Sequence, residues 1–140
     1  MKIQVIDNIG QIQPMMQMAQ ADIAFYSDEI QALNAAEQLQ PNMILLNFAL
    51  RGSQTADYTN LLLAASPMSN IVIIGDDLHE EQILQCVLAG AKGYQNSLSL
   101  AAYINRMIHA VSAGEAWLSR KIVTYVLDAL HQNYSLQPID

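Results

Sequence analysis

The stretch Met43-Ile44-Leu45-Leu46-Asn47 is a continuous apolar run that stops on an amide, and the loop Phe48-Ala49-Leu50-Arg51-Gly52-Ser53 follows it. A short apolar run bounded by turn residues predicts a strand that is buried on both faces. Such strands are typical of parallel sheets that are covered by helices on both sides. The stretch therefore predicts an α/β fold.

Similar strand-like runs lie on both sides of this one, and helical segments alternate with them. Strands are expected at 2–7, 23–26, 43–46, 71–74 and 91–95. Helices are expected at 14–21, 28–39, 55–65, 78–88 and 99–113. Five strand–helix units predict a doubly wound, five-stranded parallel sheet. An extra C-terminal helix is expected at 119–131, and the polar tail 132–140 is expected to fray.

The composition favours one folded domain that acts away from membranes and nucleic acids. Of the 140 residues, 52% are hydrophobic and 14% are charged, which is too apolar for a disordered chain. The net charge of -7 and six scattered Lys and Arg argue against nucleic-acid binding by this segment. No apolar run approaches the ~20 residues that span a bilayer, and no N-terminal signal is recognisable. Cys86 is the only cysteine, so no intrachain disulfide can form, and we expect a cytoplasmic protein.

Two motifs in the second half carry a resemblance to a known family. They are Leu88-Ala89-Gly90-Ala91-Lys92-Gly93-Tyr94 and Ser112-Ala113-Gly114-Glu115-Ala116-Trp117-Leu118-Ser119. These motifs and their spacing resemble the receiver domains of response regulators of the LuxR/NarL type, which are usually joined to a helix-turn-helix DNA-binding domain. The resemblance covers about residues 1–131 and is weak in the first half. It implies a flavodoxin-like sheet with strand order 2-1-3-4-5.

The resemblance also implies where a phosphorylation site would lie. In such domains, acidic residues after the first strand hold magnesium, and an aspartate that ends the third strand accepts the phosphoryl group. A hydroxyl residue and a lysine after the fourth and fifth strands contact that group. The matching positions in this chain hold neutral residues in all but one case: Asp7, Asn8, Asn47, Gly75 and Ser97. Because the nucleophile must be an ionised carboxylate, we expect a degenerate receiver without phosphorylation, bound metal or cofactor.

Residues near this site leave alternatives open. Asp76 could join Asp7 in a site for a hard cation, whereas Asp77 is expected to cap the helix that starts at Leu78. Arg51 could replace the missing lysine, although a solvated side chain is the simpler expectation. A neutral amide at Asn47 would also remove the repulsion between clustered carboxylates.

Tyr94 matches the family's conformational reporter, an aromatic residue that swings inward when the hydroxyl residue follows the phosphoryl group. Since Gly75 has no hydroxyl, we expect packing or a partner to fix the position of Tyr94. The family's dimerisation surface involves the last core helix, on which Tyr103 and His109 lie.

The domain organisation follows from the same resemblance. Residues 1–116 form the receiver-like domain, and residues 117–140 form a connector helix and tail. The end, Leu136-Gln137-Pro138-Ile139-Asp140, is similar to the opening of LuxR-type DNA-binding domains. It suggests a receiver cut from a longer regulator, with a natural stand-alone receiver as the rival interpretation.

Three functions compete at this point. The first is a receiver that cannot be phosphorylated and acts in signal transduction and transcription regulation, through a protein partner or as a homodimer. The second is a small-molecule sensor that uses the vacated pocket, where Asn8, Asn47 and Asn96 offer neutral hydrogen-bonding groups. The third is an enzyme or flavodoxin-like carrier, but the loop 8–12 has one glycine and no hydroxyl to hold a phosphate. We therefore expect no enzymatic activity.

Overall fold

The computed structural model describes residues 1–135, which are built around one five-stranded sheet. The strands are β1 (Lys2–Ile6), β2 (Asp22–Tyr26), β3 (Met43–Asn47), β4 (Asn70–Gly75) and β5 (Gly93–Asn96). All neighbouring strands are parallel, and their order is β2-β1-β3-β4-β5. The predicted doubly wound fold and its strand order are confirmed.

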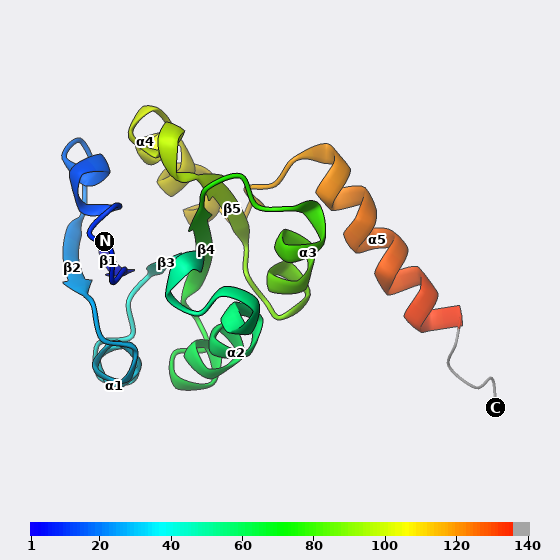
Figure 1. The fold of residues 1–140 in the computed structure, drawn as a ribbon, viewed down its shortest axis with the longest axis horizontal. Coiled ribbons are helices and arrows are strands. Elements are labelled where there is room, and N and C mark those ends of the chain that lie inside the picture. Colours follow the sequence, from blue (N-terminus) through cyan, green and yellow to red (C-terminus); the bar gives the residue numbers. More distant parts are fainter. Residues whose placement is uncertain (136–140) are drawn as a thin grey trace.

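Helices cover both faces of this sheet (Figure 1). On one face lie α1 (Glu29–Leu39), α2 (Thr55–Ala65) and α3 (Glu80–Leu88). On the other lie α4 (Leu100–Ser112) and the short 3-10 helix η1 (Gln13–Met16). Three more 3-10 turns, η2 (Phe48–Leu50), η3 (Gly52–Gln54) and η4 (Ser97–Ser99), follow the ends of β3 and β5.

The central strands are apolar throughout because each face of the sheet has its own core. Ile44 and Leu46 of β3 belong to the core under α1, α2 and α3, whereas Met43 and Leu45 belong to the core under α4. All five residues of β3 are buried, including the terminal Asn47. Side chains of a strand point alternately to the two faces of the sheet. Because helices cover both faces, apolar residues are favoured at every position of a central strand.

The first predicted helix is much shorter than expected. Residues 14–21 do not form a helix of several turns, because helical structure ends with η1 at Met16. Asn105 of α4 holds the following segment: its Nδ2 donates to the Met18 carbonyl at 2.8 Å, and its Oδ1 accepts from the Gln20 N–H at 3.1 Å. The Met18 carbonyl and the Gln20 N–H thus bind the Asn105 side chain instead of forming helical hydrogen bonds. Tertiary contacts therefore override the helical preference of residues 14–21.

Helix α3 begins later than predicted. It starts at Glu80 rather than at Leu78, and Asp77 lies outside it with a positive φ of 47°. His79 stands at the N-cap, where its N–H donates to the Gln82 side chain at 2.9 Å. The expectation that Asp77 caps this helix was wrong, because its carboxylate accepts a hydrogen bond from Asn96 instead.

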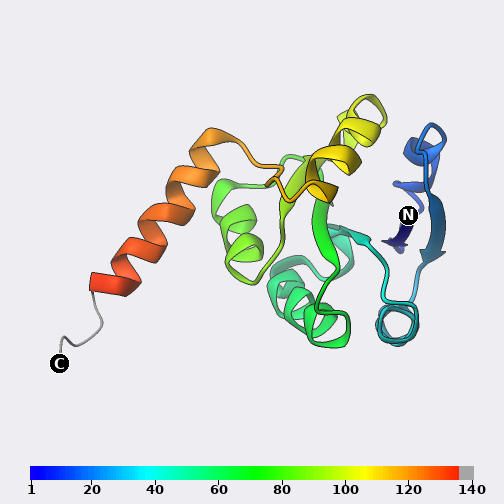
Figure 2. The same cartoon turned by 180° about the vertical axis from the view of Figure 1, so that it is seen from behind.

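The last helix, α5 (Arg120–Ser135), continues past the predicted end at His131, so residues 132–135 belong to the helix. It packs beside α3, where Lys121 Nζ lies 2.9 Å from Glu80 Oε1 and Ile122 is buried. Beyond this contact α5 extends away from the sheet, as both views show (Figure 1, Figure 2). The resemblance of 136–140 to a DNA-binding domain falls outside the described residues.

Candidate functional site

Polar side chains gather where the carboxyl ends of β1, β3, β4 and β5 meet. The strands are in register at this edge: Ile6 of β1 pairs with Leu46, and Gly75 of β4 pairs with Asn96 of β5. This is the edge where open α/β sheets place their functional groups. Of the predicted site residues, the structure brings Asp7, Asn47 and Ser97 into one hydrogen-bond network.

Asp7 follows β1 and is surrounded by neutral donors. Its Oδ1 accepts from the Ile9 N–H at 3.0 Å and from Asn47 Nδ2 at 3.0 Å. Its Oδ2 accepts from the Ile12 N–H at 2.9 Å. Three hydrogen bonds thus stabilise the carboxylate of Asp7.

Asn47 ends β3 and is 1% exposed. Its Nδ2 donates to Asp7 and, at 3.2 Å, to Gln11 Oε1, while its Oδ1 accepts from the Ala49 N–H at 2.9 Å. Both ends of the amide are therefore used. A carboxylate in this position would place a second negative charge about 3 Å from Asp7, which is strongly unfavourable in a buried setting.

Gln11 lies at the centre of the network, although no sequence motif indicates a role for it. Its Oε1 accepts from Asn47, and its Nε2 donates to Asp76 Oδ2 at 3.0 Å and to Ser97 Oγ at 3.3 Å. Ser97 Oγ in turn donates to Asp76 Oδ1. A glutamine four positions after a strand-ending aspartate is no recognised signal, so the sequence offered no way to find it.

Leu78 fills the space beside Gly75, the position that matches the family's hydroxyl residue. A Cβ added to Gly75 would lie 2.9 Å from Leu78 Cγ, closer than real side chains approach. The Tyr94 hydroxyl donates to the Gly75 carbonyl at 3.0 Å. Burial raises the pKa of Tyr94, so this group remains a hydrogen-bond donor at neutral pH.

The remaining predicted residues lie at the border of the network. Asn8 is exposed, and its side chain makes no hydrogen bond within residues 1–135. Asn96 Nδ2 donates to Asp77 Oδ1 at 3.1 Å, so these two side chains bind each other. A cavity of about 330 Å³ adjoins the network and is lined by Ile9, Gln11, Asn47, Phe48, Ala49, Gly75, Asp76 and Leu78.

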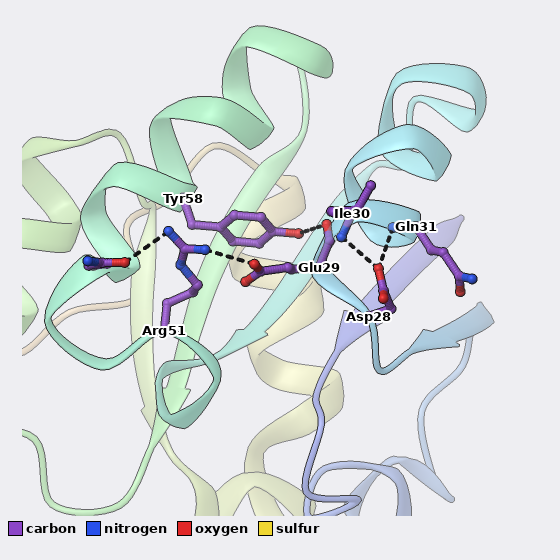
Figure 3. Close-up of polar contacts among 7 residues, drawn as sticks. Asp28, Glu29, Ile30, Gln31, Arg51 and Tyr58 are labelled. Carbon is purple, nitrogen blue, oxygen red and sulfur yellow. Dashed lines mark hydrogen bonds and ion pairs between the residues drawn. The ribbon is translucent and has the colours of Figure 1, made fainter.

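Arg51 takes part in a separate cluster, and its side chain is partly exposed (Figure 3). Its Nη1 lies 2.9 Å from Glu29 Oε1, and its guanidinium carbon lies 5.7 Å from the ring centre of Tyr58. The Tyr58 hydroxyl donates to the Glu29 carbonyl at 2.6 Å. The pKa of Tyr58 is raised mainly by burial and, to a lesser extent, by the negative charge of Glu29. Figure 3 also shows Asp28 capping α1 through the N–H groups of Ile30 and Gln31. This cluster ties the loop after β3 to the start of α1.

The charged groups at the strand ends do not form a recognisable metal centre. In the part of the chain that the structure describes, no group of three or more His, Cys, Asp and Glu could hold a metal ion. Asp7 and Asp76 are joined through Asn47 and Gln11, and both ion pairs of the described residues lie elsewhere. Among these residues, no helix is long and apolar enough to cross a membrane.

No family model matches the chain, but individual relatives are recognisable. The chain is 27% identical to the transcriptional regulatory protein LiaR of Bacillus subtilis (strain 168) over 76% of its length and 51% of that protein. It is also 27% identical to the nitrate/nitrite response regulator protein NarL of Escherichia coli (strain K12), over 74% of its length and 48% of that protein. The chain thus spans about half the length of these relatives.

Solved structures share the fold. A LuxR-family two-component response regulator from Aurantimonas sp. SI85-9A1 superposes with a TM-score of 0.73 at 19% identity, covering 91% of this chain and 96% of that one. The isolated REC domain of RcsB from Salmonella enterica serovar Typhimurium, in its apo form, gives 0.76 at 10% identity, covering 91% and 98%. The chain is therefore similar in sequence to response regulators of the LuxR/NarL type, and it shares its fold with receiver domains.

Proposed function

We propose that this chain is an atypical receiver domain that cannot be phosphorylated and that acts as a protein-interaction or dimerisation module in transcription regulation. The observation that carries the proposal is the buried amide of Asn47 at the acceptor position, with both of its ends in hydrogen bonds. An amide is no nucleophile towards a phosphoryl group, and the lysine and hydroxyl positions hold Ser97 and Gly75. The proposal includes no catalytic step and no cofactor.

The test is an amide NMR titration of the chain with magnesium, and then with magnesium plus beryllofluoride, a mimic of the phosphoryl group. We expect no saturable shifts at Asp7, Asn47, Gly75 and Ser97. Incubation with acetyl phosphate should add no mass to the protein. Saturable shifts that spread to Tyr94, or a stable mass increase of one phosphoryl group, would contradict the proposal.

A face of α5 supports the interaction role. Val123, Leu127 and Leu130 follow the i, i+4, i+7 spacing of one helix face and are 39%, 60% and 50% exposed. This spacing is typical of a helix that packs against another helix. We propose self-association through this face, which leaves any DNA contact to a domain outside this chain.

Molar mass by light scattering tests this part. We expect a dimer that dissociates in Leu127→Asn, which removes an apolar group from the middle of the face. Asp128→Asn is the matched control, because it introduces the same residue one position along α5 and leaves the apolar face intact. A monomeric wild type at tens of micromolar would exclude the homodimer and direct the search to a different protein partner.

A small-molecule sensor is the second candidate. The cavity of about 330 Å³ beside Gln11 and Asp76 favours it, because neutral amides and apolar side chains both line its wall. Native mass spectrometry of the purified protein is the measurement. A ligand that co-purifies and is lost on substitution of Phe48, which lines this cavity, would favour the sensor.

A further inference from the structure

We propose that Gln11 is a built-in ligand, whose carboxamide takes the place of an external group and holds four strand ends together. The inference rests on the proposed function, because a site that bound metal or phosphate would not need the Gln11 carboxamide in the place of that group. Gln11 is a positioning residue here and takes part in no reaction. Its role is to fix the loops around the vacated site in a single arrangement.

The backbone of the loop after β1 aims Gln11 at the site. Gly10, before it, has a positive φ of 77°, and Ile12, after it, is fully buried and donates its N–H to Asp7. Both neighbours are therefore fixed, one by a turn that favours glycine and the other by the core. The side chain of Gln11 contacts β3 through Asn47, the end of β4 through Asp76, and the end of β5 through Ser97.

The chemistry of a carboxamide suits this position. The oxygen of Gln11 accepts from Asn47, and its nitrogen donates to both carboxylate oxygens of Asp76, at 3.2 and 3.0 Å, and to Ser97. In residues 1–135 neither Asp7 nor Asp76 has a basic partner within ion-pair distance. Neutral amides therefore hold both carboxylates in place, without the charge neutralisation that a cation would give.

Removal of the Gln11 carboxamide should loosen the loops after β3, β4 and β5. Gln11 is the only described side chain that binds directly to groups from the ends of β3, β4 and β5 together. Without it, the loop after β1 keeps its bond between Ile12 and Asp7, but the link to Asp76 and Ser97 is lost. The loops after β3, β4 and β5 should then open independently, and their amide protons should exchange faster.

Amide hydrogen exchange of Gln11→Ala, measured without any divalent metal, tests this inference. We expect exchange at Ala49 and Leu98 to accelerate by about tenfold or more, as the loss of a hydrogen bond to a charged group would produce. Gln13→Ala is the matched control, because it truncates a second glutamine of the same segment that makes no hydrogen bond within residues 1–135, and its exchange should equal that of the wild type. Equal exchange in Gln11→Ala and wild type would overturn the inference.

Gln11→Glu gives a second readout, which depends on the charge at this position. A carboxylate at this place would stand beside that of Asp76, so the variant should melt at a lower temperature than the wild type. Magnesium chloride should then restore much of that loss, whereas sodium chloride of equal ionic strength should not. A melting temperature of Gln11→Glu equal to that of the wild type would overturn the inference, because a carboxylate at position 11 would then meet no repulsion from Asp76.

The two proposals fail separately. The exchange experiment contains no metal, so it decides on Gln11 alone. The titration of the wild type with magnesium and beryllofluoride decides on the proposed function. Suppose that the wild type shows no shifts in the titration and that exchange in Gln11→Ala is unchanged. The proposed non-phosphorylated receiver would then remain supported, and the proposed role of Gln11 would be excluded.

Discussion

Restoring the hydroxyl residue of an ordinary receiver by Gly75→Thr should destabilise this domain, because Leu78 already fills the space. The new Cβ would lie 2.9, 3.0 and 3.1 Å from three carbons of the Leu78 side chain, against the usual 3.5–4.0 Å between carbon atoms. The φ of Gly75 is not in the left-handed region, so the cost is steric rather than a matter of backbone strain.

The magnitude follows from two opposing effects. Overpacking of this kind costs about 1–3 kcal/mol. The loss of glycine's freedom in the unfolded chain returns roughly 0.4–1 kcal/mol. We therefore expect a net loss of about 1–2 kcal/mol in the free energy of unfolding. For a domain of this size, that corresponds to a melting temperature lower by roughly 3–8 °C.

A double-mutant cycle with Leu78→Ala, followed by urea unfolding, separates this cause from others. The Leu78→Ala background lacks the three carbon atoms nearest to the new Cβ, so Gly75→Thr should there be neutral or slightly stabilising. The coupling free energy between the two positions should then be at least about 1 kcal/mol. An equal effect of Gly75→Thr in both backgrounds would refute the argument that Leu78 occupies the hydroxyl's place.

Three further predictions concern other parts of the molecule. Tyr94→Phe should lower the free energy of unfolding by about 0.5–1.5 kcal/mol in urea, because it removes the hydrogen bond to the Gly75 carbonyl; no change would mean that this bond contributes nothing. Arg51→Met should cost about 1 kcal/mol, less at high salt, since it removes an ion pair and a cation–π contact with Tyr58. Burial raises the pKa of Cys86 to about 11, so iodoacetamide should modify it at pH 8 about a hundredfold more slowly than a free cysteine. Because the pKa of Cys86 is near 9 in the unfolded chain, the stability linked to this thiol is fully present below pH 9 and should be lost as pH rises towards 11. Cys86→Ala should abolish this pH-dependent loss of stability.

The sequence was sufficient to predict the sheet and most of its cover. Runs such as 43–46 and 71–74 are apolar at every position, and only strands with two buried faces require that pattern. The periodic apolar residues of α4 likewise predicted a helix that packs with one face on the sheet. The proposal that the acceptor position lacks a nucleophile also comes from the sequence, since it depends on the identity of Asn47 alone.

Contacts between distant segments decided the rest. Met15 to Met18 lie in a helix-like pattern, yet Asn105 of α4 holds the segment after η1 in another conformation. Gln11 meets Asn47 across 36 positions and Ser97 across 86, and the sequence contains no periodic signal for such a meeting. The sequence by itself determined which strands are buried on both faces, because nearly every position of β3 and β4 is apolar. Only the tertiary structure decided that Gln11 joins Asn47, Asp76 and Ser97, because these partners become neighbours when the parallel strand ends align.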